Sequence, residues 1–203
     1  MNKTIEIMMS EHRIIEQVLR ALETFACCLQ QGRSDSRETL ARFALFFQKF
    51  ADQCHHGKEE DRLFPTLVRC GFPREYGPIA VMLAEHDQGR SHVKALASLG
   101  QGQGPLNQDE IQSAIDHALA FVPLLLSHIQ KEDHILYPMA QQSIPPVEFD
   151  RLDAACAAFE KEIMGADEIQ RLHFLAIELT NAYPPESAAV AAAAACAGCH
   201  AHG

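Results

Sequence analysis

The sequence contains two stretches, 73 residues apart, that share the same pattern of histidine, glutamate, an aromatic residue and proline. HHGKEEDRLFP begins at His55 and HIQKEDHILYP begins at His128. A histidine and a glutamate four residues apart lie on one face of a helix. Each stretch therefore predicts a helix that presents one imidazole and one carboxylate to the same place. The aligned pairs are His55 with His128, Lys58 with Lys131, Glu59 with Glu132, Leu63 with Leu136, Phe64 with Tyr137, and Pro65 with Pro138.

Helical periodicity dominates the chain, and no segment shows the sustained alternation of a strand. Glycine and proline interrupt the pattern and separate the expected helices. Four long helices joined by short connections predict an all-α fold, an antiparallel up-down-up-down four-helix bundle with additional C-terminal helices. We expect one domain over residues 1–183 and an Ala-rich, Cys/His-containing flexible tail over 184–203. The expected helices are 4–31, 36–70, 78–100 and 109–142, followed by 146–164 and 166–182.

Polar residues interrupt the apolar stripes of three of these helices at similar depth. A buried polar group costs several kcal/mol unless another group satisfies it. A single histidine of this kind is usually hydrogen-bonded within a core, but three helices that make the same exception indicate a shared site. The interruptions are His12 between Met8 and Ile15, His86 between Met82 and Val93, and His128 with Glu132 between Leu125 and Ile135. Like the other apolar residues of these stripes, Ile135 is expected to face inward.

The adjacent residues His55 and His56 cannot both face the same place in a regular helix, because neighbours point about 100° apart. The repeat aligns His128 with His55, and apolar residues such as Ala44 and Ala51 share the His55 face. We therefore expect His55 and Glu59 to point inward and His56 and Glu60 to be solvated or to act as outer partners. A bulge in this helix would change the register.

The inward set then combines four imidazoles with two carboxylates. A catalytic acid–base pair would not need six groups, and a purely structural polar core would leave buried charges without partners. Mixed nitrogen and oxygen ligands without thiolate suit iron, and also manganese or zinc. Two ions are expected because carboxylates can bridge and each half supplies about three ligands. The predicted metal ligands are His12, His55, Glu59, His86, His128 and Glu132.

Four motifs in this order resemble those of the bacterial hemerythrin-like, or HHE cation-binding, proteins, and the resemblance covers about residues 4–183. It implies an antiparallel four-helix bundle around a non-haem di-iron centre, in which carboxylates and an oxo or hydroxo group bridge two iron ions. The four motifs are EHR at 11–13, HHGKEEDRLFP at 55–65, EHDQGR at 85–90 and HIQKEDHILYP at 128–138.

The chain departs from the oxygen-carrying hemerythrins at two positions. Arg90 stands where those proteins have a second histidine on the third helix, and Glu132 stands where they have an aspartate. An open coordination position gives a small molecule access to a metal. This favours binding or sensing of a small oxidant (oxygen, peroxide or nitric oxide) over reversible oxygen carriage. The alternatives are a di-iron enzyme that consumes peroxide or nitric oxide, and a module for iron storage or trafficking. The same ligands serve all three.

The charge and composition of the chain limit the kinds of molecule that it is expected to bind. The net charge of −10, from 17 basic and 27 acidic residues, argues against binding to nucleic acid or to an anionic membrane surface. The first residues, MNKTIEIMMSEH, lack the features of an export signal, and no apolar run approaches a membrane span. We therefore expect a cytoplasmic protein, and the sequence does not indicate a protein partner.

The seven cysteines form an odd set without the pattern of a small disulfide scaffold, so reduced thiols are expected. Cys196, Cys199 and His200 match the C-x-x-C-H pattern of covalent haem attachment. That chemistry requires export and a haem pocket. We expect this tail to be disordered, with a redox-active or metal-scavenging role as the alternative to haem attachment.

Overall fold

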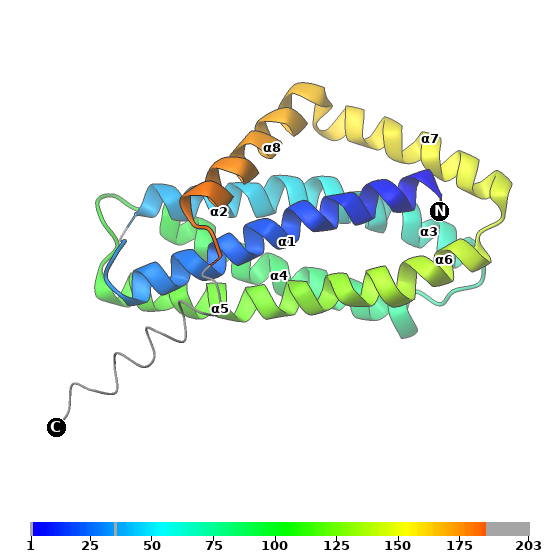
Figure 1. Ribbon diagram of the computed structural model, residues 1–203. Coiled ribbons are helices and arrows are strands. Elements are labelled where there is room, and N and C mark those ends of the chain that lie inside the picture. The colour runs from blue at the N-terminus through cyan, green and yellow to red at the C-terminus, as the bar shows by residue number, and fades with distance from the viewer. Residues whose placement is uncertain (1, 35, 186–203) are drawn as a thin grey trace.

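The computed structural model describes residues 2–34 and 36–185, and over these residues it is helical without strands (Figure 1). The prediction of an all-α fold is confirmed. The predicted tail lies almost entirely outside the described residues. The elements are α1 (Lys3–Gln30), α2 (Arg37–Phe46), the π-helical segments η1 (Phe47–His56) and η2 (Glu59–Leu63), α3 (Phe64–Arg69), α4 (Gly77–Gly100), α5 (Gln108–Lys131), the π-helical segment η3 (Glu132–Leu136), α6 (Tyr137–Ser143), α7 (Pro146–Ile163) and α8 (Gly165–Ala182).

These elements form four long helical rods that lie side by side (Figure 1). The first rod is α1, the second runs from α2 through α3, the third is α4, and the fourth runs from α5 through α6. The fourth rod packs against both α1 and α4, and α2 packs against α4. The last two helices form a hairpin across one side of the rods, shown in yellow and orange. In it α7 contacts α1, η1 and η2, while α8 contacts α1 and α2.

Side-chain caps begin three of the rods. The Asn2 side chain accepts a hydrogen bond from the Thr4 amide at 3.0 Å, and the Ser36 hydroxyl accepts one from the Thr39 amide at 3.1 Å. Asn107 begins α5 with a capping box to Glu110. Such caps satisfy amides that have no partner within the helix. Within the described residues, no helix combines the length and the apolar character needed to cross a membrane.

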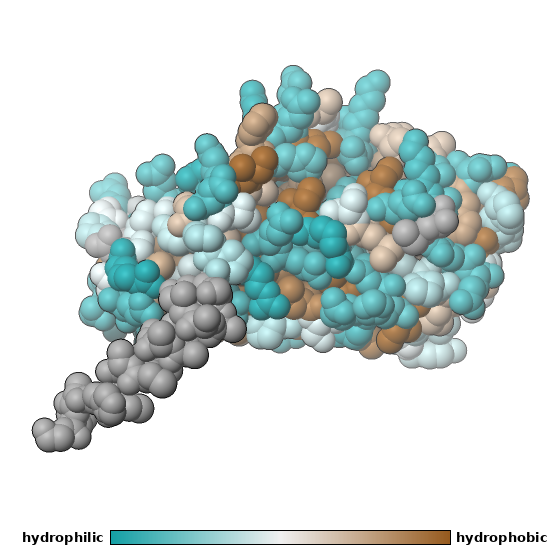
Figure 2. Space-filling model, in the orientation of Figure 1, coloured by the Kyte–Doolittle hydropathy of each residue, from teal (hydrophilic) through white to brown (hydrophobic). Residues whose placement is uncertain are grey.

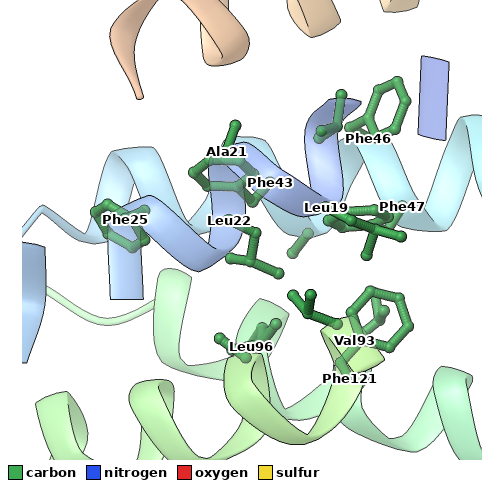
Figure 3. Packing of buried hydrophobic residues seen from close by; sticks show 14 of the residues in the cluster. Leu19, Ala21, Leu22, Phe25, Phe43, Phe46, Phe47, Val93, Leu96 and Phe121 are labelled. Carbon is green, nitrogen blue, oxygen red and sulfur yellow. The ribbon is translucent and has the colours of Figure 1, made fainter. Parts of the chain in front are cut away.

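Two apolar clusters fill the interior, one toward each end of the rods. The larger cluster packs aromatic and aliphatic side chains of all four rods (Figure 3). The smaller cluster includes Ile5 and Met8 of α1 and Leu136 of the fourth rod. Between the two clusters, His12 lies one helical turn beyond Met8 and just before Ile15. The interior therefore has a polar layer with apolar packing on both sides, beneath a surface of mixed polarity (Figure 2).

The π-helical turns are the main departure from regular helices. In both repeats a five-residue π segment starts at the glutamate of the His-x-x-x-Glu pattern, Glu59 or Glu132, and ends two residues before a proline. Proline has no amide hydrogen to donate, and its ring displaces the carbonyl four residues earlier. The wider turn shifts the inward face by one residue. As a result Leu136 is buried, whereas Ile135 is 51% exposed, so the expectation that Ile135 faces inward is wrong.

Candidate metal centre

All six predicted ligands meet in the polar layer, each at most 1% exposed. Every rod contributes: α1 and α4 supply one histidine each, and the second and fourth rods supply a histidine and a glutamate each. Together with His56, which is not one of the six, they supply donor atoms in two groups in which all atoms lie within 4.8 Å of one another, a spacing that could hold metal ions. The groups are His12, His55 and Glu132, and His56, Glu59, His86 and His128.

The imidazoles pair across the rods through their Nε2 atoms. The Nε2 atoms of His12 and His55 lie 2.9 Å apart, and those of His86 and His128 lie 3.1 Å apart. Each pair joins the histidine of one helix to the His-x-x-x-Glu histidine of the same repeat. The layer is therefore built from two similar halves, as the internal repeat predicts.

The two carboxylates lie between the halves. Glu132 places one oxygen 3.2 Å from His12 Nε2 and the other 3.1 Å from His128 Nε2. Glu59 Oε2 lies 3.3 Å from His86 Nε2 and 3.9 Å from His55 Nε2. Each glutamate thus lies near one imidazole from each of the two repeats. A carboxylate that bridges two ions would take this position.

A carboxylate holds the other ring nitrogen of each of these four histidines. The Nδ1 atoms lie 2.6–2.9 Å from carboxylate oxygens of a residue next to a predicted ligand in the chain. Such carboxylates orient metal-binding imidazoles and fix their tautomer. Although the sequence contains them in its EH and ED motifs, their role was not foreseen, apart from the outer position of Glu60. The pairs are His12 with Asp133, His55 with Glu11, His86 with Glu60, and His128 with Glu85.

The ionisation of these outer carboxylates decides where the imidazole lone pairs point. Burial raises the pKa of Glu11, Glu60 and Asp133. Hydrogen bonds and attraction from the histidines, together with Lys58, Arg90 and Arg13 respectively, outweigh burial and hold each pKa below its usual value. An ionised carboxylate only accepts hydrogen bonds, so Nδ1 must carry the proton. In a neutral imidazole the inward Nε2 then offers a lone pair. Two lone pairs facing each other at about 3 Å repel unless a proton or a cation lies between them.

Unpartnered carboxylate oxygens provide a test of whether a cation fits. Glu59 Oε2 and both oxygens of Glu132 are buried and make no well-formed hydrogen bond to any described residue. Burial raises the pKa of Glu59, but hydrogen bonding and attraction from His86 and His55 lower it, so that the group is ionised. Burying a charged oxygen without a partner is costly. Metal ions would satisfy these oxygens and the inward imidazole nitrogens together.

The sequence predicts that His56 is either solvated or an outer partner of the site, and the structure rules out the solvated position. Its side chain is 6% exposed, and its ring stacks on His86 with centroids 3.8 Å apart. The cause is η1, in which the Gly57 amide bonds to the Asp52 carbonyl five residues earlier. This wider turn brings both adjacent histidines into the interior. Burial, followed by repulsion from His86, keeps the pKa of His56 well below its usual value, so the ring is neutral.

Arg90 supports the layer from outside it. Its Nε donates to Asp52 at 2.8 Å, and its second guanidinium nitrogen donates to Glu60 at 2.6 Å. It therefore braces the carboxylate that holds His86 and supplies no ligand to the interior. The inner layer therefore gains no group from this position.

The aromatic residues just before the prolines of the two repeat motifs border the centre differently. Tyr137 is buried, stacks on His12 and donates a hydrogen bond to Glu59 at 2.8 Å. Its equivalent, Phe64, lies parallel to His86 with ring centroids 6.1 Å apart. The two halves therefore have equivalent predicted ligands, but the aromatic residue beside them is polar in one half and apolar in the other.

A third cluster, of Glu11, Cys54 and Glu160, also has donor atoms close together. Here the buried ammonium of Lys58 binds both Glu11 and, at 3.1 Å, Glu160 of α7. Lys58 thus fills the place that a cation would take. Burial raises the pKa of the Cys54 thiol to about 12, so this sulfur is a neutral thiol at ordinary pH. The cluster is an internal ion-pair network that connects α7 to His55, one of the predicted ligands.

Comparisons with known proteins identify distant relatives and a family. The chain is 21% identical over 144 residues to the uncharacterized protein Rv1995 of Mycobacterium tuberculosis, and equally so to the uncharacterized protein Mb2018 of Mycobacterium bovis. Each alignment covers 71% of this chain and 56% of the relative, so the chain spans little more than half the length of these curated relatives. No solved structure matches the chain significantly. The profile of the hemerythrin HHE cation-binding domain matches residues 3–140, which include all six predicted ligands, and the chain therefore belongs to this family.

Proposed function

We propose that this protein holds two iron ions in a non-haem centre, inside an antiparallel up-down-up-down four-helix bundle, and binds or senses oxygen or a related small oxidant there. The observation that carries the proposal is the position of Glu59 and Glu132 between the two pairs of histidines. The proposed ligands are His12, His55, Glu59, His86, His128 and Glu132.

Two ions suit this arrangement better than one. The Nε2 atoms form two separate pairs, and each carboxylate reaches into both. Two bridging carboxylates and two imidazoles per ion neutralise part of the charge and suit iron, with manganese and zinc as competitors for the same ligands.

A small ligand is expected because six residues do not complete the coordination of two octahedral ions. The apolar clusters on both sides of the layer exclude large solutes. Ferrous ions bound here would supply the electrons that an oxidant takes up. The role of the protein is to orient the imidazoles through their Nδ1 carboxylates and to keep the layer closed to bulk water.

Metal analysis followed by oxygen addition tests the proposal. Protein prepared without oxygen in iron-rich medium should contain about two iron ions per chain, and oxygen should produce a stable absorption change. Iron near zero under these conditions would reject the centre. Catalytic loss of added peroxide or nitric oxide would favour an enzyme, and rapid transfer of iron to a mild chelator would favour storage or trafficking.

A further inference from the structure

His56 is a buried polar residue of the central layer that the twofold repeat does not explain. The alignment that pairs His55 with His128 pairs His56 with Ile129, and both of these residues are buried. Packing at this position therefore requires only an apolar side chain. One half of the polar layer carries an additional imidazole beside Glu59 and His86, and the other half does not.

The ring geometry excludes His56 as a ligand of the ion that His86 would hold. The two rings are within 15° of parallel, with centroids 3.8 Å apart. Imidazole binds a metal through a nitrogen lone pair that lies in the ring plane. Two nearly parallel planes at this separation do not meet at one ion, so His86 and His56 cannot both coordinate it in this arrangement.

One ring nitrogen of His56 nevertheless makes no hydrogen bond within the described residues. Its Nδ1 is buried and has no hydrogen-bond partner among the described residues, and the nearest carboxylate, on Asp52, is 3.5 Å away. One ring nitrogen lies within 4.8 Å of donor atoms of Glu59, His86 and His128. An imidazole offers an N–H donor at about the distance at which it would reach a molecule bound next to these groups.

We infer that His56 hydrogen-bonds a small polar ligand that occupies the open position beside Glu59, His86 and His128. This inference rests on the proposed function and specifies it further. The ligand would enter the half of the layer that holds His56, because on the other side the hydroxyl of Tyr137 is already bound to Glu59. A ligand with a good hydrogen-bond acceptor, such as an anion, is then favoured over an apolar one of the same size.

Azide binding to the iron-loaded protein tests this role. The variant His56→Phe keeps an aromatic ring on His86 and removes both nitrogens. It should retain the iron content of the wild type and bind azide about tenfold more weakly, as expected for loss of one hydrogen bond to a charged group. His173→Phe, at an exposed histidine on α8, is the matched control and should bind azide normally. His56→Ile copies the residue of the other repeat and provides a second variant with the same expected result.

The outcomes separate this inference from the proposal on which it rests. Unchanged azide affinity in an iron-loaded His56 variant would overturn the inference alone. Loss of iron from a folded His56 variant would also overturn it, because it would identify His56 as a ligand. A wild-type protein that binds no iron would reject the proposed centre and this inference with it.

Discussion

The hydroxyl of Tyr137 lies 2.8 Å from Glu59 Oε1, so a residue of the second repeat holds a carboxylate of the first. The equivalent residue, Phe64, offers no hydroxyl to Glu132, whose two oxygens make no well-formed hydrogen bond in the described part of the chain and lie 3.2 and 3.1 Å from the Nε2 atoms of His12 and His128. The two carboxylates therefore differ in how much of their charge the protein satisfies. The charge of Glu132 is balanced by the imidazoles of His12 and His128 or by a bound metal ion rather than by a hydroxyl group.

Replacing Tyr137 with phenylalanine should destabilise the metal-free protein by about 1.5–3 kcal/mol, the usual contribution of a buried hydrogen bond to a charged group. The loss should be smaller in the iron-loaded protein, because the metal also stabilises Glu59. Urea unfolding of both forms measures the difference. Equal losses in the two forms would show that the hydroxyl does not act through the carboxylate.

The adjacent residues Glu59 and Glu60 should respond differently to the loss of charge. Glu59→Gln should abolish binding of at least one iron ion, because both halves of the layer use this carboxylate. Glu60→Gln should weaken binding by about 10–100-fold at most, because Glu60 acts through His86 Nδ1. Titration with ferrous iron in the absence of oxygen measures both, with circular dichroism as the check on folding. Stronger loss in the Glu60 variant would place the ligands one residue away from those proposed.

The helices and the convergence of the six predicted residues could be anticipated because both depend on local periodicity and on the repeat. The interruption of apolar rows at His12, His86 and His128 is visible without coordinates. The bounds of the expected helices are within a few residues of those observed. The ligand role of these residues stays a prediction.

The register errors came from assuming 3.6 residues per turn throughout. The π segments add a residue to the turn, which buries His56 and turns Ile135 outward. The prolines that accompany two of these segments are visible in the sequence, but η1, which moves His56, has no such signal. The contact of Glu160 with Lys58 depends on how α7 lies across the rods, which periodicity does not determine.

Lys58 and its repeat equivalent Lys131 provide a matched test of burial. Lys58 is 1% exposed between Glu11 and Glu160, whereas the Lys131 side chain is 32% exposed beside Glu85. Lys58→Ala should cost about 3–5 kcal/mol because it removes the ammonium from a buried carboxylate and leaves it only the His55 imidazole, and Lys131→Ala about 1 kcal/mol or less. Urea unfolding measures both. Similar losses would mean that α7 does not seal the first pair from water.

Iron affinity should rise with pH, because two ligands hold protons that the metal must displace. Burial lowers the pKa of His12, but its hydrogen bond to Asp133 and the nearby carboxylates of Glu132 and Glu59 raise it to about 9. Burial also lowers the pKa of His128. The Glu132 carboxylate, 3.1 Å from Nε2, and the hydrogen bond to Glu85 outweigh this effect and raise the pKa to about 10. In the metal-free protein both imidazoles are therefore cationic at pH 7.

The raised pKa values fix the direction of two pH effects. In the metal-free protein the protonated histidines stabilise the fold fully below their unfolded pKa of about 6.5, and this stabilisation is lost as pH rises through about 9–10. Iron binding at pH 7 should release about two protons from these residues, and affinity should increase about tenfold per pH unit for each proton released. Proton release on adding ferrous iron in weak buffer without oxygen measures the number. Asp133→Asn, which removes one cause of the raised pKa of His12, should release fewer protons. Iron binding without proton release would contradict the cationic state of the empty layer.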